Sequence, residues 1–462
     1  MNHALFAPHA LLPTGWASDV LITWDVAGAL ARVSPGAAPA DGIPTATGPI
    51  LPGMPNLHSH AFQRAFAGLS EYRGAEGQAD SFWTWRDLMY GFALALTPDQ
   101  LEDIATHLYI EMLQAGYTSV CEFHYVHRDP AGGAYADPAE MSVRLLAAAQ
   151  RAGIGITLLP VLYQDAGFGA QAARADQRRF VNSVDQVLTI AERLRTPARA
   201  QGAGVGVAPH SLRAVGPAAL HELVAAWTAI DAAAPIHLHI AEQAQEVRDC
   251  LAWSGQRPVQ WLLDHAPVDV RWCLVHATHL TAEEAAAVAA TGATAGLCPT
   301  TEANLGDGVF DAVTYTQCRG AWGIGSDSHA SVSAAEELRL LEYTQRLARQ
   351  RRNVLASAAQ PQVADHLWLA ALQGGARASG RAIGGLQVGQ QADFLMLDSA
   401  GVLAGLSPSQ ALASHVFASH GRNAVRDVWV AGRRVLHGGE HTLQGKACER
   451  FVAARGQLLS HV

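Results

Sequence analysis

Eight short apolar segments recur between residues 50 and 330, and they alternate with stretches of helical spacing. The helical stretches at 98–116 and 137–153 each end in glycine, a common helix stop. Apolar strands separated by helices pair into a parallel sheet that is covered on both faces. Eight such strands fit a closed barrel. We therefore expect an α/β fold, a (β/α)8 TIM-like barrel, with its strands in these segments: 50–60, 118–125, 154–163, 204–211, 235–242, 272–280, 293–306 and 322–329.

The two ends of the chain have a different pattern. Residues 20–26, 386–398 and 424–439 alternate apolar and polar residues between glycine turns, as half-buried antiparallel strands do. Because this pattern occurs at both ends, we expect a small β-sandwich to which both contribute. The predicted domains are this discontinuous sandwich, residues 1–50 and 386–462, and the barrel, residues 51–385.

Composition and charge limit the classes of function. Apolar residues make up 49% of the chain and charged residues 16%, an ordinary globular composition. No apolar run approaches the roughly 20 residues of a membrane span, and the N-terminal stretch lacks the basic start of a secretory signal. A net charge of −9 argues against a general nucleic-acid binder, which needs a basic face. Six scattered cysteines favour reduced thiols, so we expect a cytoplasmic protein. From the net charge and the short apolar runs we expect no nucleic-acid and no membrane partner.

Polar side chains stand at the C-terminal ends of the expected strands, where barrels build active sites. His58 and His60 end the first strand, and their spacing directs both imidazoles to one side, toward one ion. Taken alone, this pair also fits two structural histidines. With His239 ending the fifth strand and Asp327 the eighth, a metal site is the better interpretation. Three imidazoles and one carboxylate suit one divalent catalytic ion, and zinc is the expected one.

With these residues the sequence resembles the amidohydrolase superfamily along essentially its whole length. The matching pieces are the strand-end HxH, the segment from His239 to Glu242, the strand of His276 and Gly-Ser-Asp327. Many members bridge two metals through a carboxylated lysine of the fourth strand. Residues 204–211 contain no lysine here, and the single lysine of the chain, Lys446, lies outside the barrel segment. The resemblance therefore implies a mononuclear site of the deaminase type.

The resemblance also implies roles for single residues. It favours His239 over His237, because His-x-x-Glu spacing belongs to the deaminases and His237 would lie deeper in the barrel. Zinc lowers the pKa of a bound water, which supplies hydroxide to attack the substrate carbon. Asp327 would then accept the proton of that water, and Glu242 would pass protons to the departing ammonia. His276 would polarise or orient the reacting group. A Glu242 paired with an arginine and a structural His276 are the alternatives.

Two further segments indicate a substrate. Residues 51–68 and 82–90, with 122–125 and 208–215, resemble the superfamily members that convert N-formimino-L-glutamate to N-formyl-L-glutamate and ammonia in histidine degradation. That small molecule carries two carboxylates and one amidine carbon. Arg86 and Arg213 are each expected to clamp a carboxylate by paired hydrogen bonds. Tyr125 and His210 are neighbouring donors, and Gln63 is expected to hold the formimino group or the glutamate backbone.

Four of these five residues have a structural alternative. Arg86 follows Trp83 and Trp85 and fits a surface arginine stacked on a ring. Arg213 fits a salt bridge at the start of a helix. Tyr125 fits plain packing, and Gln63 fits an exposed helix position.

Other functions and an assembly state also follow as hypotheses. A related deaminase acting on a nucleobase is the first rival, a non-catalytic barrel that serves assembly is the second, and hydrolysis of an amide or a lactam is the third. The sandwich surfaces favour a homodimer. Glu336 and Glu337 begin a helix after the last strand, and we expect both on its solvated face.

Overall fold

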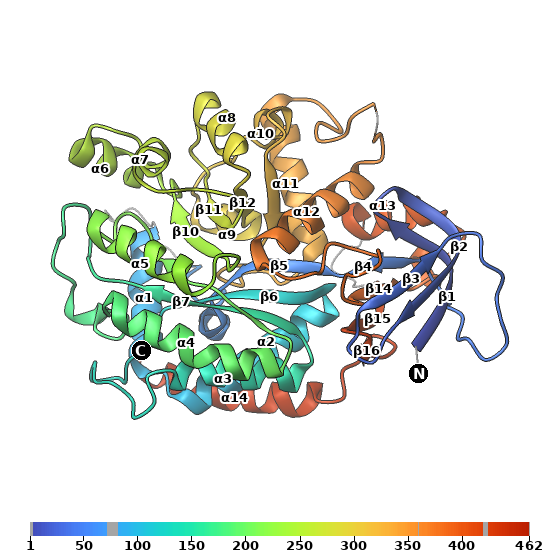
Figure 1. The fold of residues 1–462 in the computed structure, drawn as a ribbon, viewed down its shortest axis with the longest axis horizontal. Coiled ribbons are helices and arrows are strands. Elements are labelled where there is room, and N and C mark those ends of the chain that lie inside the picture. Colours follow the sequence, from blue (N-terminus) through green and yellow to red (C-terminus); the bar gives the residue numbers. More distant parts are fainter. Residues whose placement is uncertain (1–2, 72–81, 359, 419–423, 462) are drawn as a thin grey trace.

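The computed structural model describes residues 3–71, 82–358, 360–418 and 424–461 (Figure 1). All eight expected barrel segments contain strands, and the fourth segment contains two short ones. The barrel strands are β5 (Met54–Ser59), β6 (Tyr117–His124), β7 (Gly155–Leu162), β8 (Gly204–Val205), β9 (Ala208–Pro209), β10 (Ile236–Ile240), β11 (Trp272–His276), β12 (Thr294–Leu297) and β13 (Ala321–Ile324).

These strands form two parallel half-sheets that meet at two seams. One half-sheet has the order β5-β6-β7-β8, with β9 also on β7, and the other has the order β10-β11-β12-β13. At one seam the His237 backbone N–H donates to the Val207 carbonyl over 3.1 Å. At the other, the Asp327 N–H donates to the His58 carbonyl over 3.0 Å. This arrangement confirms the predicted TIM-like barrel.

Helices cover the outside of the barrel, and local signals in the sequence define their ends. Before α2, the Thr97 side chain accepts from the N–H of Gln100, whose own side chain accepts from the Thr97 N–H. Helix α3 ends at Gly153 with a φ of 75°, a left-handed conformation that glycine adopts freely. The helices of the barrel part are α1 (Phe82–Ala95), α2 (Pro98–Gln114), α3 (Glu140–Ala152), α4 (Val184–Ala200), α5 (Pro217–Ile230), α6 (Ala244–Ser254), α7 (Pro258–His265), α8 (Ala282–Thr291), α9 (Pro299–Leu305), α10 (Ala312–Gln317), α11 (Ala334–Arg349) and α12 (Val363–Ser379).

The two chain ends meet in one seven-stranded sheet at the side of the barrel (Figure 1). Its order is β16-β15-β14-β4-β1-β2-β3. Three strand spacings of about 4.8 Å separate β14 from β2 in this order. The rings of Phe394 on β14 and Trp24 on β2 nevertheless lie 5.6 Å apart, so the sheet folds over its own core. The bounds are β1 (His3–Leu12), β2 (Gly15–Trp24), β3 (Leu30–Ser34), β4 (Ile50–Pro52), β14 (Phe394–Leu397), β15 (Val425–Val430) and β16 (Arg433–Leu436).

Gly53 divides the first expected strand between the two sheets. Ile50–Pro52 pairs with β1 and β14, whereas Met54–Ser59 pairs with β6 in the barrel. A Cβ atom on Gly53 would lie 2.2 Å from the Thr118 side chain, so the chain can cross here only as glycine. The domain boundaries at 50/51 and 385/386 stay a prediction.

The C-terminal part adds α13 (Pro408–Ala418) and α14 (Gln444–Leu459). Helix α14 packs against α2, where the rings of Phe451 and His107 stack 4.5 Å apart. In the part of the chain that the structure describes, no helix is long and apolar enough to cross a membrane.

One expectation for α11 was wrong. Glu337 is fully buried, and it accepts hydrogen bonds from the backbone N–H and the hydroxyl of Thr300 in the first turn of α9. A hydrogen-bond acceptor is favourable there because the first N–H groups of a helix have no partner inside it. Glu336, its neighbour, is only half-buried. Two adjacent glutamates do not reveal in the sequence which of them faces inward.

Candidate active site

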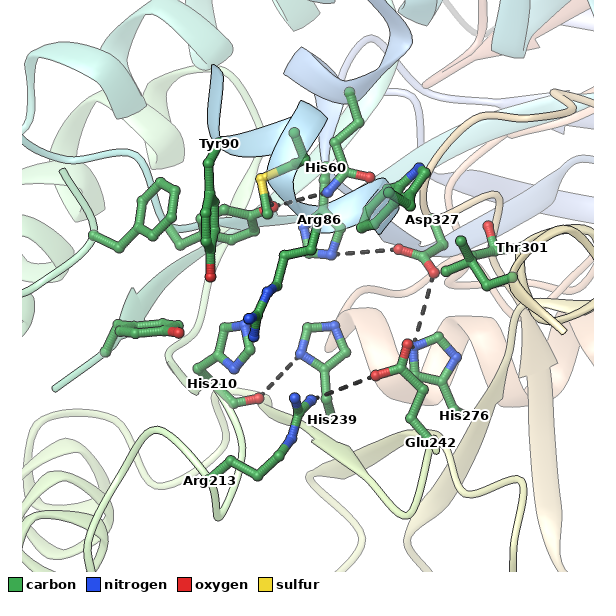
Figure 2. Close-up of a pocket in the computed structure, with 17 residues that line it drawn as sticks. His60, Arg86, Tyr90, His210, Arg213, His239, Glu242, His276, Thr301 and Asp327 are labelled. Atoms are coloured by element: carbon green, nitrogen blue, oxygen red, sulfur yellow. Dashed lines mark hydrogen bonds and ion pairs between the residues drawn. The ribbon is translucent and has the colours of Figure 1, made fainter. Parts of the chain in front are cut away.

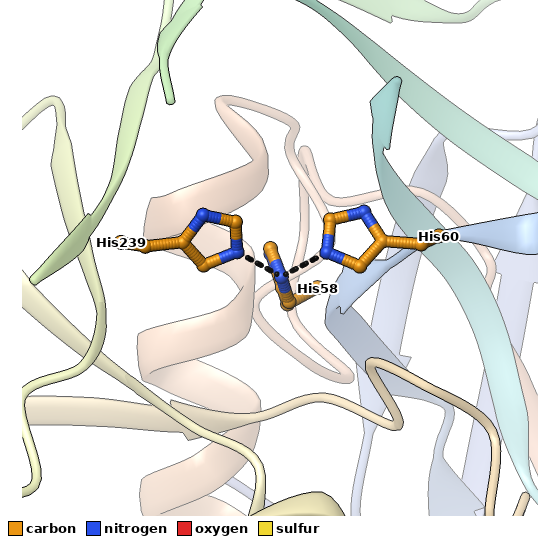
Figure 3. A group of neighbouring side chains, drawn as sticks. All are labelled: His58, His60 and His239. Carbon is orange, nitrogen blue, oxygen red and sulfur yellow. Dashed lines mark hydrogen bonds between the residues drawn. The ribbon is translucent and has the colours of Figure 1, made fainter. Parts of the chain in front are cut away.

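Four predicted metal ligands converge at the C-terminal ends of the barrel strands. The Nε2 atom of His58, on β5, lies 3.2 Å from that of His60 and 3.0 Å from that of His239, on β10 (Figure 3). Asp327, which follows β13, has its Oδ1 atom 3.5 Å from His58 Nε2 and 3.3 Å from His60 Nε2. Asp327 has a φ of 48°, a strained left-handed backbone of the kind that concentrates at functional sites.

Hydrogen bonds on the far side of two rings turn their lone pairs toward this centre. His60 Nδ1 lies 2.8 Å from the Phe123 carbonyl, and His239 Nδ1 lies 3.0 Å from the His210 carbonyl. A carbonyl only accepts, so both rings carry their proton on Nδ1 and present an unprotonated Nε2.

The electrostatics of the group fit a cation. Burial lowers the pKa of His58 to about 3 and also lowers the pKa of His60 and His239, so the three rings are neutral. Burial raises the pKa of Asp327. The hydrogen bond and the charge interaction with His58 lower it by more, so the pKa of Asp327 ends below its usual range. The ring nitrogens of His58, His60 and His239 lie within 4.8 Å of one another, and so do the ligand atoms of His58, His276 and Asp327, so this cluster can hold a divalent metal ion.

His237 lies outside this group. Its Nε2 atom donates to the carbonyl of Ala378, on α12, over 2.8 Å. It is fully buried, deeper in the barrel than His239 on the same strand. The structure therefore places His239, and not His237, beside His58.

Next to the ligands lies a buried group of acids around His276, at the end of β11. Its Nε2 atom lies 3.8 Å from Glu242 Oε1 and 3.8 Å from Asp327 Oδ2, and its Nδ1 atom lies 3.3 Å from Glu302 Oε1. Burial lowers the pKa of His276, but Glu242 and Glu302 outweigh it and raise the pKa to about 10. Burial raises the pKa of Glu242, although His276 and Arg213 oppose this shift. A proton can thus be held and exchanged beside the metal ligands.

A pocket opens onto these groups (Figure 2). It brings together all five predicted substrate residues with three of the predicted metal ligands, His60, His239 and Asp327. In Figure 2, Arg86 and Arg213 extend into the pocket from different elements. The five are Gln63, Arg86, Tyr125, His210 and Arg213.

The contacts of these residues bear on the structural alternatives. Gln63 is buried in a short helix, η1 (Ala61–Phe66), rather than exposed. Its Nε2 atom donates to the Tyr125 hydroxyl over 2.8 Å, and its buried Oε1 atom has no partner among the described residues. Arg86 lies with Cζ 5.5 Å above the ring of Tyr90, while the side chain of Trp83 lies outside the described residues. Arg213 forms an ion pair with Glu242, 3.5 Å away.

Comparison with known proteins agrees with this geometry. The sequence model of the Amidohydrolase family matches residues 50–435. The chain belongs to the amidohydrolase family. Among curated relatives of this amidohydrolase, the formimidoylglutamate deiminase of Pseudomonas aeruginosa is 52% identical over 456 residues, 99% of each chain. The 8-oxoguanine deaminase of the same species is 29% identical over 75% of this chain and 74% of its own.

Solved structures share the fold. An amidohydrolase from Brucella melitensis has a TM-score of 0.93 and 46% identity, covering 99% of this chain and 100% of its own. An adenosine deaminase from Xanthomonas campestris, with bound zinc, has a TM-score of 0.80, covering 99% of this chain and 98% of its own. Because the adenosine deaminase is only 23% identical to this chain, its similarity shows a shared fold and nothing about function.

Sequence reasoning missed several residues of the amidohydrolase site. Tyr163, which lines the pocket, comes directly after β7, and Glu302, which holds His276, follows β12 by five positions. These are the two strands to which the sequence analysis assigned no polar end residue. Applying the strand-end rule to the third strand would have found Tyr163, whereas Glu302 lies on α9 and has no such signal. Tyr90 and Gln177 carry no such signal, since Tyr90 lies on α1 and Gln177 in the short helix η2 (Ala175–Gln177).

Proposed function

We propose that this amidohydrolase hydrolyses N-formimino-L-glutamate to N-formyl-L-glutamate and ammonia, a reaction of histidine degradation. One observation carries the proposal: a single pocket is lined by three of the four proposed metal ligands and by two arginines, Arg86 and Arg213. A substrate with one amidine carbon and two carboxylates matches those three features. The relative that is 52% identical over the full length bears the name of this activity.

The four ligands hold one divalent ion, which we propose to be zinc: His58, His60, His239 and Asp327. When bound, the ion supplies a Lewis acid that brings the pKa of a water toward neutrality. Asp327 accepts a proton from the attacking water, and Glu242 delivers a proton to the nitrogen that leaves as ammonia. His276, held by Glu302, donates to and orients the reacting group.

The rest of the pocket binds the glutamate part. Arg86 and Arg213 each form paired hydrogen bonds to a carboxylate. Tyr125 and His210 add donors to the same anions. The Oε1 atom of Gln63, which has no partner among the residues that the structure describes, accepts an N–H of the formimino group or of the glutamate nitrogen.

Ammonia release tests the activity. The purified protein is expected to release ammonia from N-formimino-L-glutamate and not from guanine, cytosine or adenosine. Turnover of one of those rings without turnover of the first compound would replace the proposal with a nucleobase deaminase. Unchanged activity in the His58→Asn and Asp327→Asn variants would overturn the metal mechanism.

Assembly and location complete the proposal. We propose a homodimer that acts in the cytoplasm on this dicarboxylate, without nucleic-acid or membrane partners. The net charge of −9 supports the absence of a nucleic-acid partner. Light scattering after size-exclusion chromatography gives the mass in solution, and a monomer would contradict the dimer.

A further inference from the structure

Three uncharged polar side chains lie together at the pocket, and none of them has a part in the function proposed above. Tyr90, on α1, and Tyr163, directly after β7, both line the pocket with Arg86 and Arg213. Behind them is Gln177, in the short helix η2 (Ala175–Gln177), which is fully buried.

The hydrogen bonds of Gln177 determine the direction in which both tyrosine hydroxyls act. The backbone N–H of Arg174 donates to Gln177 Oε1 over 2.8 Å, and this contact fixes which end of the amide is oxygen. Gln177 Nε2 then donates to the Tyr163 oxygen over 2.8 Å and to the Tyr90 oxygen over 3.0 Å. Both N–H bonds of the amide are used, so each phenol oxygen is an acceptor here and its own hydrogen points elsewhere.

The surroundings make these hydroxyls donors to an anion in the pocket. Among the described residues, neither hydroxyl donates to a carboxylate or to a backbone carbonyl. The Arg86 guanidinium lies 5.5 Å from the centre of the Tyr90 ring, and the ring of Tyr163 lies 4.7 Å from that of His210. Burial raises the pKa of Tyr163 and Tyr90 adds to this shift, so the Tyr163 hydroxyl keeps its proton. A hydrogen bond between the two phenols would use only one of their two hydroxyl hydrogens, so at least one hydrogen stays available to the pocket.

We propose that Tyr90 and Tyr163, oriented by Gln177, donate hydrogen bonds to one carboxylate of the substrate beside Arg86 and select for substrates that carry it. This inference rests on the proposed dicarboxylate substrate and deepens it. Gln177 is a positioning residue, because it acts only through the two hydroxyls.

Conservative variants test the two hydroxyls. Tyr90→Phe and Tyr163→Phe each remove one donor and keep the ring, and we expect each to raise KM about tenfold with kcat within about twofold. In Gln177→Glu, the carboxylate accepts from both phenols and withdraws both donors, so KM is expected to rise further. Tyr117→Phe is the matched control, since Tyr117 is a fully buried tyrosine outside the pocket lining. An unchanged KM in all three pocket variants, with unchanged thermal unfolding, would overturn the proposal.

Substrate analogues separate carboxylate binding from a general effect on the pocket. N-formimino-4-aminobutyrate and N-formimino-L-norvaline each lack one of the two carboxylates. One of these analogues lacks the carboxylate that the tyrosines bind. For that analogue, the variants and the wild type should have the same KM. An equal penalty for the full substrate and for both analogues would refute carboxylate binding.

A binding measurement distinguishes this inference from the proposed function. If the wild type does not turn over N-formimino-L-glutamate, the proposed function fails, and calorimetric titration with glutarate and butyrate still tests the hydroxyls. We expect the wild type to bind glutarate more tightly than butyrate and the Tyr→Phe variants to lose most of that difference. A difference that the variants retain would contradict the inference whether or not the enzyme is active.

Discussion

Replacing Glu302 with glutamine tests how the site holds His276. Glu302 Oε1 lies 3.3 Å from His276 Nδ1 and also accepts the Cys298 N–H over 2.8 Å. Both side chains are buried, so solvent screens their interaction little. The Glu302→Gln variant keeps the shape and an acceptor oxygen but removes the negative charge.

The magnitude follows from that distance. Two unit charges 3.3 Å apart attract by about 5 kcal/mol at an effective dielectric constant of about 20. Glutamine still accepts the hydrogen bond, and Glu242 and Asp327 remain 3.8 Å from the ring, so we expect a loss of about 2 kcal/mol. This loss corresponds to a kcat about 30-fold lower. It also lowers the pKa of His276 below its value of about 10.

Steady-state ammonia release between pH 6 and 10 measures both effects. The folded protein keeps the His276 proton up to its pKa, so activity that needs this proton declines above that value. In the variant the alkaline decline should begin at lower pH. Glu337→Gln is the matched control, because Glu337 is another buried carboxylate that bonds α9, through Thr300, without contacting His276. A folded Glu302→Gln variant with wild-type kcat and an unchanged pH profile would refute the reasoning.

Three further predictions concern the metal, acid stability and the carboxylate clamp. Dialysis against a chelator is expected to abolish ammonia release and to lower the Tm, and adding zinc should restore both. The reason is that the converging lone pairs of His58, His60 and His239 then lack a cation. Retained activity in a demonstrably metal-free sample would contradict this prediction. Burial lowers the pKa of His415 to about 4, so the unfolded chain binds more protons between pH 4 and 6.5 and stability is lost as the pH falls through that window. His415→Leu should therefore lessen the loss of unfolding free energy between pH 7.5 and 5, measured in urea, by about 2 kcal/mol, and an equal loss in both proteins would refute the assignment. Arg86→Lys should raise KM about tenfold with little change in kcat, since an ammonium cannot form the paired hydrogen bonds; initial rates measure this, and a fall in kcat alone would argue against a binding role.

Periodicity in the sequence predicted most of the fold. Strand and helix patterns depend on which side chains face the core, and that preference is local, so all eight barrel strands were expected in the right places. The junction at Gly53 was not, because only the close approach of Thr118 from β6 forces the chain to divide there. The inward position of Glu337 likewise depends on a partner, Thr300, on another helix.

The candidate site divides in the same way. The two-residue spacing of His58 and His60 determines that their side chains share one side of a strand, wherever that strand lies. Their convergence with His239 and Asp327 depends on barrel closure, which joins residues far apart in the chain.

The sequence by itself determined the barrel, the paired ends and the residue types at the strand ends, because these follow from the burial preference of each short segment. Only the tertiary structure decided which of two histidines on β10 meets His58, that Glu302 contacts His276, and that Gln177 donates to two tyrosine hydroxyls. Those facts depend on distances and hydrogen-bond directions between separate elements, and spacing along one chain does not contain them.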